Sequence, residues 1–206
     1  MQIAAFIILF LFYGTYFTKL FIQRKQGIRT NLLGKGKTGL VKFIEITLKI
    51  VTYIVPVVEV ISICIWYDYN VYIMALYKSV WFRSLGLVFG VSGTAIFIIS
   101  IITMRDSWRA GVPQNESTEL VTTGIYHYSR NPAFLGFDLI YLGILFMFFN
   151  WFLFGITLLA VFMLHLQIVN VEEDYLIKTF GDEYIEYSKT VCRYFGRSRF
   201  CKKTRS

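Results

Sequence analysis

The stretch that decides the fold is residues 139–171, LIYLGILFMFFNWFLFGITLLAVFMLHLQIVNV, which contains no Asp, Glu, Lys or Arg. One helix of these 33 residues would be roughly 50 Å long at 1.5 Å per residue. The hydrocarbon core of a bilayer is about 30 Å thick and needs roughly 20 helical residues. The stretch therefore predicts a helical hairpin, with spans at about 133–149 and 151–171 and a turn at Asn150 and Trp151.

The rest of the chain has the composition of an integral membrane protein. Of its 206 residues, 56% are hydrophobic, 18% aromatic and 17% charged, and the apolar residues gather in runs. Three further runs, at about 2–22, 43–66 and 84–104, are long enough to span a bilayer as helices. The sequence thus predicts an all-α integral membrane protein with about five transmembrane helices, three of them within 1–104.

The basic residues predict how the chain crosses the membrane. The net charge is +8, with seven Lys or Arg and no acid between 19 and 42, and seven more between 189 and 205. These residues flank apolar runs, which indicates membrane topology and no nucleic-acid partner. Five spans place both basic segments and the loop 105–130 in the cytoplasm, with the N-terminus outside. We therefore expect a multi-pass membrane protein.

Two local patterns refine this picture. Gly86, Gly90 and Gly93 have the spacing that lets a second helix approach closely, although glycine as filler explains them equally well. Residues 172–191, EEDYLIKTFGDEYIEYSKTV, place an aromatic or Leu every three or four residues, which predicts an amphipathic helix at the cytoplasmic interface. Gly181 is expected to break this helix. The hairpin brings the start of this amphipathic helix, Glu172 and Glu173, beside the segment that precedes the span at about 133–149.

Those two segments carry a family resemblance. Residues 120–136, LVTTGIYHYSRNPAFLG, followed by the paired acids and the pattern of 172–191, resemble the membrane methyltransferases typified by isoprenylcysteine carboxyl methyltransferase. The resemblance spans roughly 107–194. It implies a single membrane domain over 1–206, in which 105–206 form a cofactor-binding loop, a helical hairpin and a C-terminal interfacial helix.

The resemblance implies S-adenosylmethionine as cofactor and a lipophilic or lipidated substrate that enters from the membrane lipids. Glu172 is the expected catalytic and substrate-orienting residue. His165 is a further substrate-binding candidate, although a histidine satisfied within the core is the alternative. The cofactor-binding residues that it implies are Gln114, Leu120, Val121, Tyr126, Arg130, Asn131, Pro132, Ala133, Phe134, Gly136 and Glu173.

The residue types suit this cofactor, which carries a carboxylate, an ammonium, an adenine and a sulfonium. Arg130 can bind a carboxylate through two hydrogen bonds, and either glutamate can bind the ammonium. Aromatic faces such as those of Tyr126 and Phe134 attract a cation by about 0.5 to 2 kcal/mol. The alternatives are that Arg130 binds lipid phosphate and that the glutamates start a solvated helix.

Three positions depart from the family pattern. Asn131 replaces a histidine, Phe134 a tyrosine, and Ile168 an arginine that would suit a substrate carboxylate. Asn-Pro also resembles the phospholipid N-methyltransferases of the same superfamily. A carboxylate, amine, thiol or lipid head group therefore stays open as the acceptor.

Two other functions remain as alternatives. A sterol-type membrane reductase that uses NADPH has a related Arg-x-Pro-x-aromatic-x-Gly loop, and a non-enzymatic membrane protein would bind no cofactor. The three cysteines lack metal-site spacing, so no metal is expected. Glu59 beside Pro56 is an acid within a span, and a functional role and a structural hydrogen bond are equally plausible for it.

Overall fold

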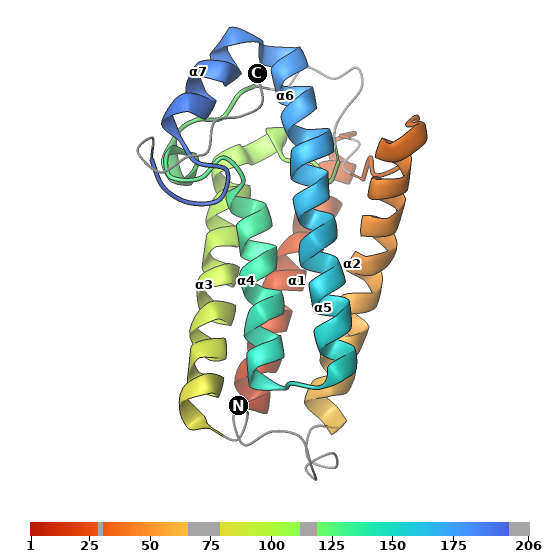
Figure 1. The fold of residues 1–206 in the computed structure, drawn as a ribbon, viewed down its shortest axis with the longest axis vertical. Coiled ribbons are helices and arrows are strands. Elements are labelled where there is room, and N and C mark those ends of the chain that lie inside the picture. Colours follow the sequence, from red (N-terminus) through yellow and green to blue (C-terminus); the bar gives the residue numbers. More distant parts are fainter. Residues whose placement is uncertain (29–30, 66–78, 112–118, 198–206) are drawn as a thin grey trace.

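The computed structural model describes residues 1–28, 31–65, 79–111 and 119–197, and these are almost entirely helical (Figure 1). No strand occurs among them, which agrees with the all-α prediction. Three of the elements are short: η1 and η2 are 3-10 helices, and η3 is a π-helix. In chain order the elements are α1 Gln2–Lys25, α2 Gly39–Ile65, α3 Val80–Met104, η1 Arg105–Ser107, η2 Gly124–His127, α4 Pro132–Met147, α5 Trp151–Gln167, η3 Ile168–Glu172, α6 Glu173–Phe180 and α7 Asp182–Thr190.

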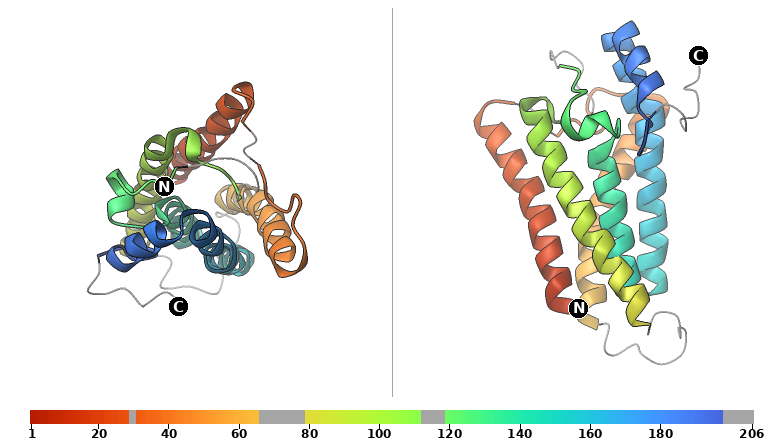
Figure 2. Two further views of the ribbon diagram at one scale, coloured as in Figure 1. Left: turned by 90° about the horizontal axis from the view of Figure 1, so that it is seen from above. Right: turned by 90° about the vertical axis from the view of Figure 1, so that its left-hand side faces the viewer.

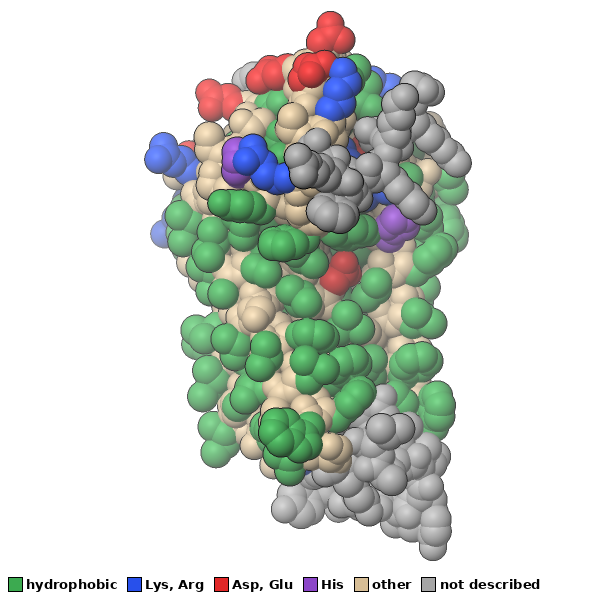
Figure 3. Space-filling model, turned by 60° about the vertical axis from the view of Figure 1, so that its left-hand side comes forward, with side chains coloured by type: hydrophobic (Ala, Val, Ile, Leu, Met, Phe, Trp, Pro, Cys, Tyr) green, Lys and Arg blue, Asp and Glu red, His purple; other side chains and the backbone are tan. Residues whose placement is uncertain are grey.

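Five of these helices form the membrane bundle. Four helical stretches are long and apolar enough to cross a bilayer, and α4 is a shorter apolar helix beside them. Large hydrophobic side chains such as Phe10, Phe43, Ile102 and Phe152 are exposed on the outer surface. Figure 3 shows hydrophobic side chains over most of one face, with charged side chains gathered at the end that carries α6 and α7. The chain is therefore a multi-pass membrane protein.

The predicted hairpin is present. Helix α4 ends at Met147, and α5 starts after Asn150, whose side chain accepts a hydrogen bond from Leu153 N at 2.8 Å. Asparagine at this position satisfies one of the N–H groups that a helix start leaves unpaired. The turn thus lies at Asn150 and Trp151, where the sequence predicts it.

The second arm of the hairpin continues further than expected. Helix α5 runs through η3 into α6, so that Trp151–Phe180 forms one stretch of 30 residues. The chain breaks only at Gly181, which has a φ of 53°. An L side chain rarely adopts this angle, whereas glycine does so readily. The predicted break at Gly181 is therefore confirmed, but the amphipathic segment before it extends the membrane helix and only α7 folds away.

Helices α3 and α4 approach each other through glycines. A Cβ built on Gly86 would lie 2.7 Å from Gly143 O, and one on Gly93 would lie 2.8 Å from Gly136 O. A Cβ on Gly143 would lie 2.6 Å from Gly90 N. Contacts this short are possible only without side chains. The glycine spacing in α3 therefore serves close helix packing and is not filler.

The bundle places the site at one end. Helix α2 packs on α5 and α1 packs on α3, while α4 lies between α3 and α5 (Figure 2). The N-terminus of α1 lies at the end opposite α6 and α7 (Figure 1). The described parts of the loop between α1 and α2, η1, η2 and α7 all lie at the α6 end. Which face of the membrane this end occupies stays a prediction, as does the division of the chain at 104.

The glycine contact predicts a difference between two alanine substitutions. Gly143→Ala should lower the free energy of unfolding by about 1 to 3 kcal/mol, because the added methyl meets the α3 backbone. Gly155→Ala in α5 meets nothing within 4 Å and should leave stability equal or slightly higher. Thermal unfolding of both variants in detergent measures this. Equal stability of the two variants would contradict the close approach of α3 and α4.

Candidate functional site

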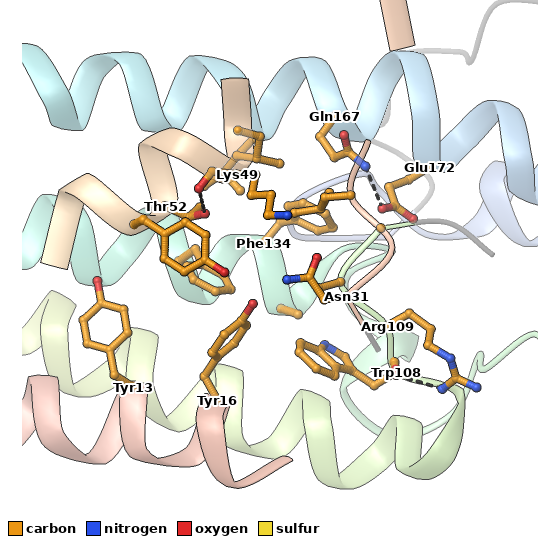
Figure 4. Close-up of a pocket in the computed structure, with 18 of the residues that line it drawn as sticks. Tyr13, Tyr16, Asn31, Lys49, Thr52, Trp108, Arg109, Phe134, Gln167 and Glu172 are labelled. Atoms are coloured by element: carbon orange, nitrogen blue, oxygen red, sulfur yellow. Dashed lines mark hydrogen bonds between the residues drawn. The ribbon is translucent and has the colours of Figure 1, made fainter. Parts of the chain in front are cut away.

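A cavity of about 240 Å³ lies between α1, α2, α4 and α5 near the α6 end of the bundle (Figure 4). Most of its wall is apolar or aromatic, with a few polar side chains among them. Such a lining suits a ligand with a large apolar part and a small polar part. The lining residues are Tyr13, Tyr16, Phe17, Asn31, Leu33, Leu48, Lys49, Thr52, Tyr53, Pro56, Trp108, Arg109, Ala110, Gly111, Ala133, Phe134, Phe137, Leu164, Gln167 and Glu172.

Two loops that are distant in sequence close this end of the cavity. Leu32 N donates a hydrogen bond to Ala110 O at 2.9 Å, which joins the segment after α1 to the segment after η1. Gln23 Nε2 in α1 donates to Trp108 O at 3.0 Å. Glu45 in α2 is fully buried and accepts from Gly34 N at 2.7 Å. The loops are therefore held to each other and to the helices below them.

The π-helix η3 gives the cavity its carboxylate. In an α-helix, the residues that face one another are three or four apart. A π-helix has a wider turn with a five-residue repeat, and such turns are frequent at functional sites. Gln167 and Glu172 are five residues apart, and Gln167 Nε2 donates to Glu172 Oε1 at 3.1 Å. Both side chains line the cavity (Figure 4).

Two acceptor oxygens at this end have no partner. Asn31 Oδ1 and Gln167 Oε1 are buried and make no hydrogen bond within the part of the chain that the structure describes. A buried acceptor without a donor costs about 1 to 3 kcal/mol. Together with the Glu172 carboxylate, these oxygens form a polar end that would be completed by a ligand bearing N–H groups. We refer to Asn31, Gln167 and Glu172 as the polar end of the cavity.

Arg130 and Glu173 lie in a second, separate cluster. Arg130 Nη1 lies 3.2 Å from Glu173 Oε1 and donates a hydrogen bond to Tyr184 OH at 2.9 Å. Arg193 donates to Glu173 through two bonds of 2.8 Å. Arg130 and Glu173 are buried. We call Arg130, Glu173, Tyr184 and Arg193 the ion cluster. The cluster joins the start of α4 to α6, α7 and the segment after α7.

Hydrogen bonds around the ion cluster hold the same segments together. Asn131 Nδ2 donates to Arg193 O at 3.1 Å, and Arg130 N donates to Cys192 O at 3.0 Å. Burial raises the pKa of Tyr184 to about 12, against the lowering effect of the Arg130 guanidinium. The hydrogen bonds to Glu173 raise the pKa of Arg193. Arg193 therefore keeps its charge, and Tyr184 keeps its hydroxyl proton, at neutral pH.

The structure divides the predicted site residues between these places. Ala133, Phe134 and Glu172 line the cavity. Arg130 and Glu173 bind each other, although Arg130 Nε has no partner among the described residues. The roles predicted for both toward a cofactor stay predictions.

The other predicted residues lie around these two places. Pro132 is buried at the first turn of α4, where its missing N–H costs nothing, and the Tyr126 carbonyl accepts from Tyr187 OH. Leu120 and Val121 are half-buried before η2 and do not line the cavity. Gln114 lies outside the described residues.

Gly136 and His165 lie away from the cavity. Gly136 packs against Gly93 in α3, as described above. His165 Nδ1 lies 2.6 Å from Tyr194 OH, and both residues line an outward groove with Asp138. His165 thus has a hydrogen-bonding partner outside the cavity, and its predicted contact with substrate stays a prediction.

Glu59 is fully buried and accepts a hydrogen bond from Tyr13 OH at 2.8 Å. The partner lies on α1, so this contact ties α1 to α2. The sequence left two roles open for Glu59, a functional one and a structural hydrogen bond. The structural hydrogen bond is present. Tyr13 itself lines the cavity.

Sequence reasoning missed several cavity residues, namely Asn31, Lys49, Trp108 and Gln167. Lys49 was visible as a cation inside an apolar span, and Gln167 as a polar residue in the charge-free run. Asn31 and Trp108 belong to loops whose pairing depends on the folded bundle. Local sequence gives no signal for such a pairing.

The ion cluster predicts a large effect from one neutral substitution. Glu173→Gln leaves two guanidinium groups near each other without their carboxylate, and breaking a buried pair in this way costs about 3 to 5 kcal/mol. Asp174→Asn, one residue later, removes an exposed carboxylate and should cost little. Thermal unfolding and limited proteolysis of the region after α5 measure both variants. A Glu173→Gln variant as stable as Asp174→Asn would contradict a structural role for the cluster.

Comparisons with known proteins show which family this chain resembles. The family described as phospholipid methyltransferase matches residues 81–183, which include all but the first residue of α3, the helices α4 and α5, and the pair Glu172 and Glu173. The Protein-S-isoprenylcysteine O-methyltransferase of Schizosaccharomyces pombe is 40% identical over 81 residues, 38% of this chain and 33% of that protein. The protein of the same name from Rattus norvegicus is 27% identical over 124 residues, 59% of this chain and 44% of that protein.

The match to the second yeast relative is similar. The Protein-S-isoprenylcysteine O-methyltransferase of Saccharomyces cerevisiae is 38% identical over 72 residues, 35% of this chain and 30% of that protein. The chain thus spans less than half the length of each of these relatives. The family match covers half of the chain. The chain therefore belongs to the phospholipid methyltransferase family.

Proposed function

We propose that this protein transfers a methyl group from S-adenosylmethionine to a lipophilic acceptor at the cavity. The observation that carries the proposal is that Ala133, Phe134 and Glu172, from two motifs of the family segment, line one cavity. The relatives that the chain matches are named as methyltransferases of isoprenylcysteine. An acceptor with an isoprenoid or acyl chain suits the apolar wall.

The residues of the cavity fit the cofactor. The polar end offers two unpartnered oxygens and a carboxylate, which match the ammonium and amino N–H groups of S-adenosylmethionine. Trp108, Tyr16 and Phe134 provide aromatic surface for the adenine and the sulfonium. We propose that the donor is held at this end, between the two loops and η3.

The chain contributes positioning and exclusion of water. Bound S-adenosylmethionine supplies an electrophilic methyl whose carbon–sulfur bond breaks as the acceptor bonds to carbon, the electron pair staying on sulfur. Holding donor and acceptor in line in a dry cavity can supply most of the rate acceleration. Glu172 orients the reacting groups, and it accepts the proton if the acceptor is a protonated amine. A carboxylate acceptor releases no proton.

The location of the reaction follows from the position of the cavity. The polar end lies beside the loops, at the end of the bundle that carries α6 and α7, and the apolar wall extends along membrane helices. We propose that this end faces the cytoplasm, since the positive-inside tendency of 19–42 and 189–205 favours it.

Titration with S-adenosylhomocysteine tests the proposal. The purified protein should bind it saturably, and Glu172→Gln should weaken binding about tenfold, because a hydrogen bond to a charged group contributes about 1.5 to 3 kcal/mol. Glu183→Gln, an exposed acid of α7, is the matched control and should bind as the unchanged protein does. Transfer of labelled methyl to lipid extracts and to N-acetyl-S-farnesyl-L-cysteine then identifies the acceptor. A folded protein that binds NADPH and no S-adenosylhomocysteine would refute the proposal.

A further inference from the structure

Lys49 is a cation inside the membrane bundle that has no ion-pair partner within the part of the chain that the structure describes. It lies on α2, between the buried Leu48 and the helix positions Thr52 and Tyr53 that also line the cavity. Figure 4 shows its side chain extending from α2 among the cavity residues. No ion pair involves Lys49 in the described ranges 1–28, 31–65, 79–111 and 119–197. A charged side chain within a membrane-spanning helix indicates a functional site, and it needs a counter-ion.

The protein's own carboxylates near this end are engaged elsewhere. Glu45, one turn before Lys49, is bound to the loop at Gly34 N. Glu172 is hydrogen-bonded by Gln167 across the π turn, and Glu173 lies in the ion cluster. The counter-ion of Lys49 is therefore expected to come from a ligand.

The other cation in the cavity wall is less suited to bind that ligand. Arg109 Nη1 donates to Trp108 O at 2.9 Å and also to Asp106 O, so its guanidinium is turned toward the loop backbone (Figure 4). Lys49, by contrast, lies among the apolar and aromatic side chains of the cavity wall. Lys49 is thus the cation that an anion buried in the apolar part of the cavity would meet.

Position 168 explains why such a cation is needed from α2. The family resemblance implies an arginine there for a substrate carboxylate, and this chain has Ile168. Ile168 is fully buried in η3 and does not line the cavity. A carboxylate in the cavity would have no cation from η3 and would face Lys49 on the opposite wall.

We propose that Lys49 binds the carboxylate of the methyl acceptor and so makes an S-alkylated cysteine, or another lipophilic carboxylic acid, the preferred substrate. The inference rests on the proposed methyl transfer and names its acceptor class. Lys49 is a specificity residue, because it holds the oxygen pair that receives the methyl group. Methylation turns the carboxylate into a neutral ester, which Lys49 no longer attracts, and this favours product release.

The anion at Lys49 could instead be the carboxylate of the methyl donor. The position of Lys49 favours the acceptor. Lys49 lies one helical turn beyond Glu45, which fastens the loop over the donor end, and therefore deeper along α2. The two sources predict different effects on the affinity for S-adenosylhomocysteine.

Binding of matched acid and ester probes tests the proposal without any need for turnover. N-acetyl-S-farnesyl-L-cysteine and its methyl ester differ only in the charge that Lys49 is expected to bind. The unchanged protein should bind the acid more tightly, and Lys49→Met should weaken acid binding about 10- to 100-fold while ester binding stays the same. Lys49→Arg should restore much of the preference for the acid. Lys42→Met, an exposed lysine of α2 away from the cavity lining, should bind both probes as the unchanged protein does.

Three results with Lys49→Met would overturn the assignment. Equal weakening of acid and ester by Lys49→Met would show a packing role, and no change in either would show that the carboxylate lies elsewhere. Loss of S-adenosylhomocysteine affinity in Lys49→Met, with acid preference retained, would assign the lysine to the donor. If the unchanged protein binds S-adenosylhomocysteine but does not prefer the acid probe, this inference fails and the proposed methyl transfer stands. If it prefers the acid probe but binds no S-adenosylhomocysteine, the proposed function fails and the carboxylate site stands.

Discussion

The site depends most on the buried carboxylate of Glu173. It is shared by Arg130 from the start of α4 and Arg193 from the segment after α7, with Tyr184 completing the cluster. Removing these charges from water is costly, and the cost is offset only when each charge has its partners in place. The three segments are therefore held in one arrangement. Because Glu172 immediately precedes Glu173, the same arrangement directs Glu172 to the other side of the helix, where it lines the cavity.

The glycine contact between α3 and α4 provides the rigid wall for this arrangement. It fixes α4 against α3 along its length, and Gly136 lies only a turn from Pro132, where α4 begins. The first turn of α4 also holds Ala133 and Phe134, which line the cavity. Gly136 thus serves the site through packing, because its lack of a side chain lets the first turn of α4 lie close to α3. The family match begins at residue 81, near the start of α3, and so includes both sides of this contact.

The sequence predicted those features whose cause is local. The hairpin turn at Asn150 and the break at Gly181 follow from residue chemistry at single positions, and the structure confirms both. The π turn was not predictable, because 168–172 contain no residue that breaks a helix, and the wider turn becomes visible only in the pairing of Gln167 with Glu172. The polar end was missed for a similar reason, since Asn31 reaches the cavity through loop contacts with a segment far along the chain. The partner of Arg130 also depends on long-range packing, which a motif does not specify.

The cavity combines charges from opposite walls, and this explains how the chain tolerates Ile168. A long cationic side chain at 168 would start from a fully buried position in η3, next to a turn that already presents Glu172. Lys49 approaches from α2, across the cavity, so that on the proposed assignment an anion between the walls would be bound without a cation beside the acid. Separating the positive and negative groups in this way leaves the polar end free for N–H groups and the apolar part free for a chain that carries a carboxylate. The same cavity can then distinguish the two ends of its ligands by charge alone.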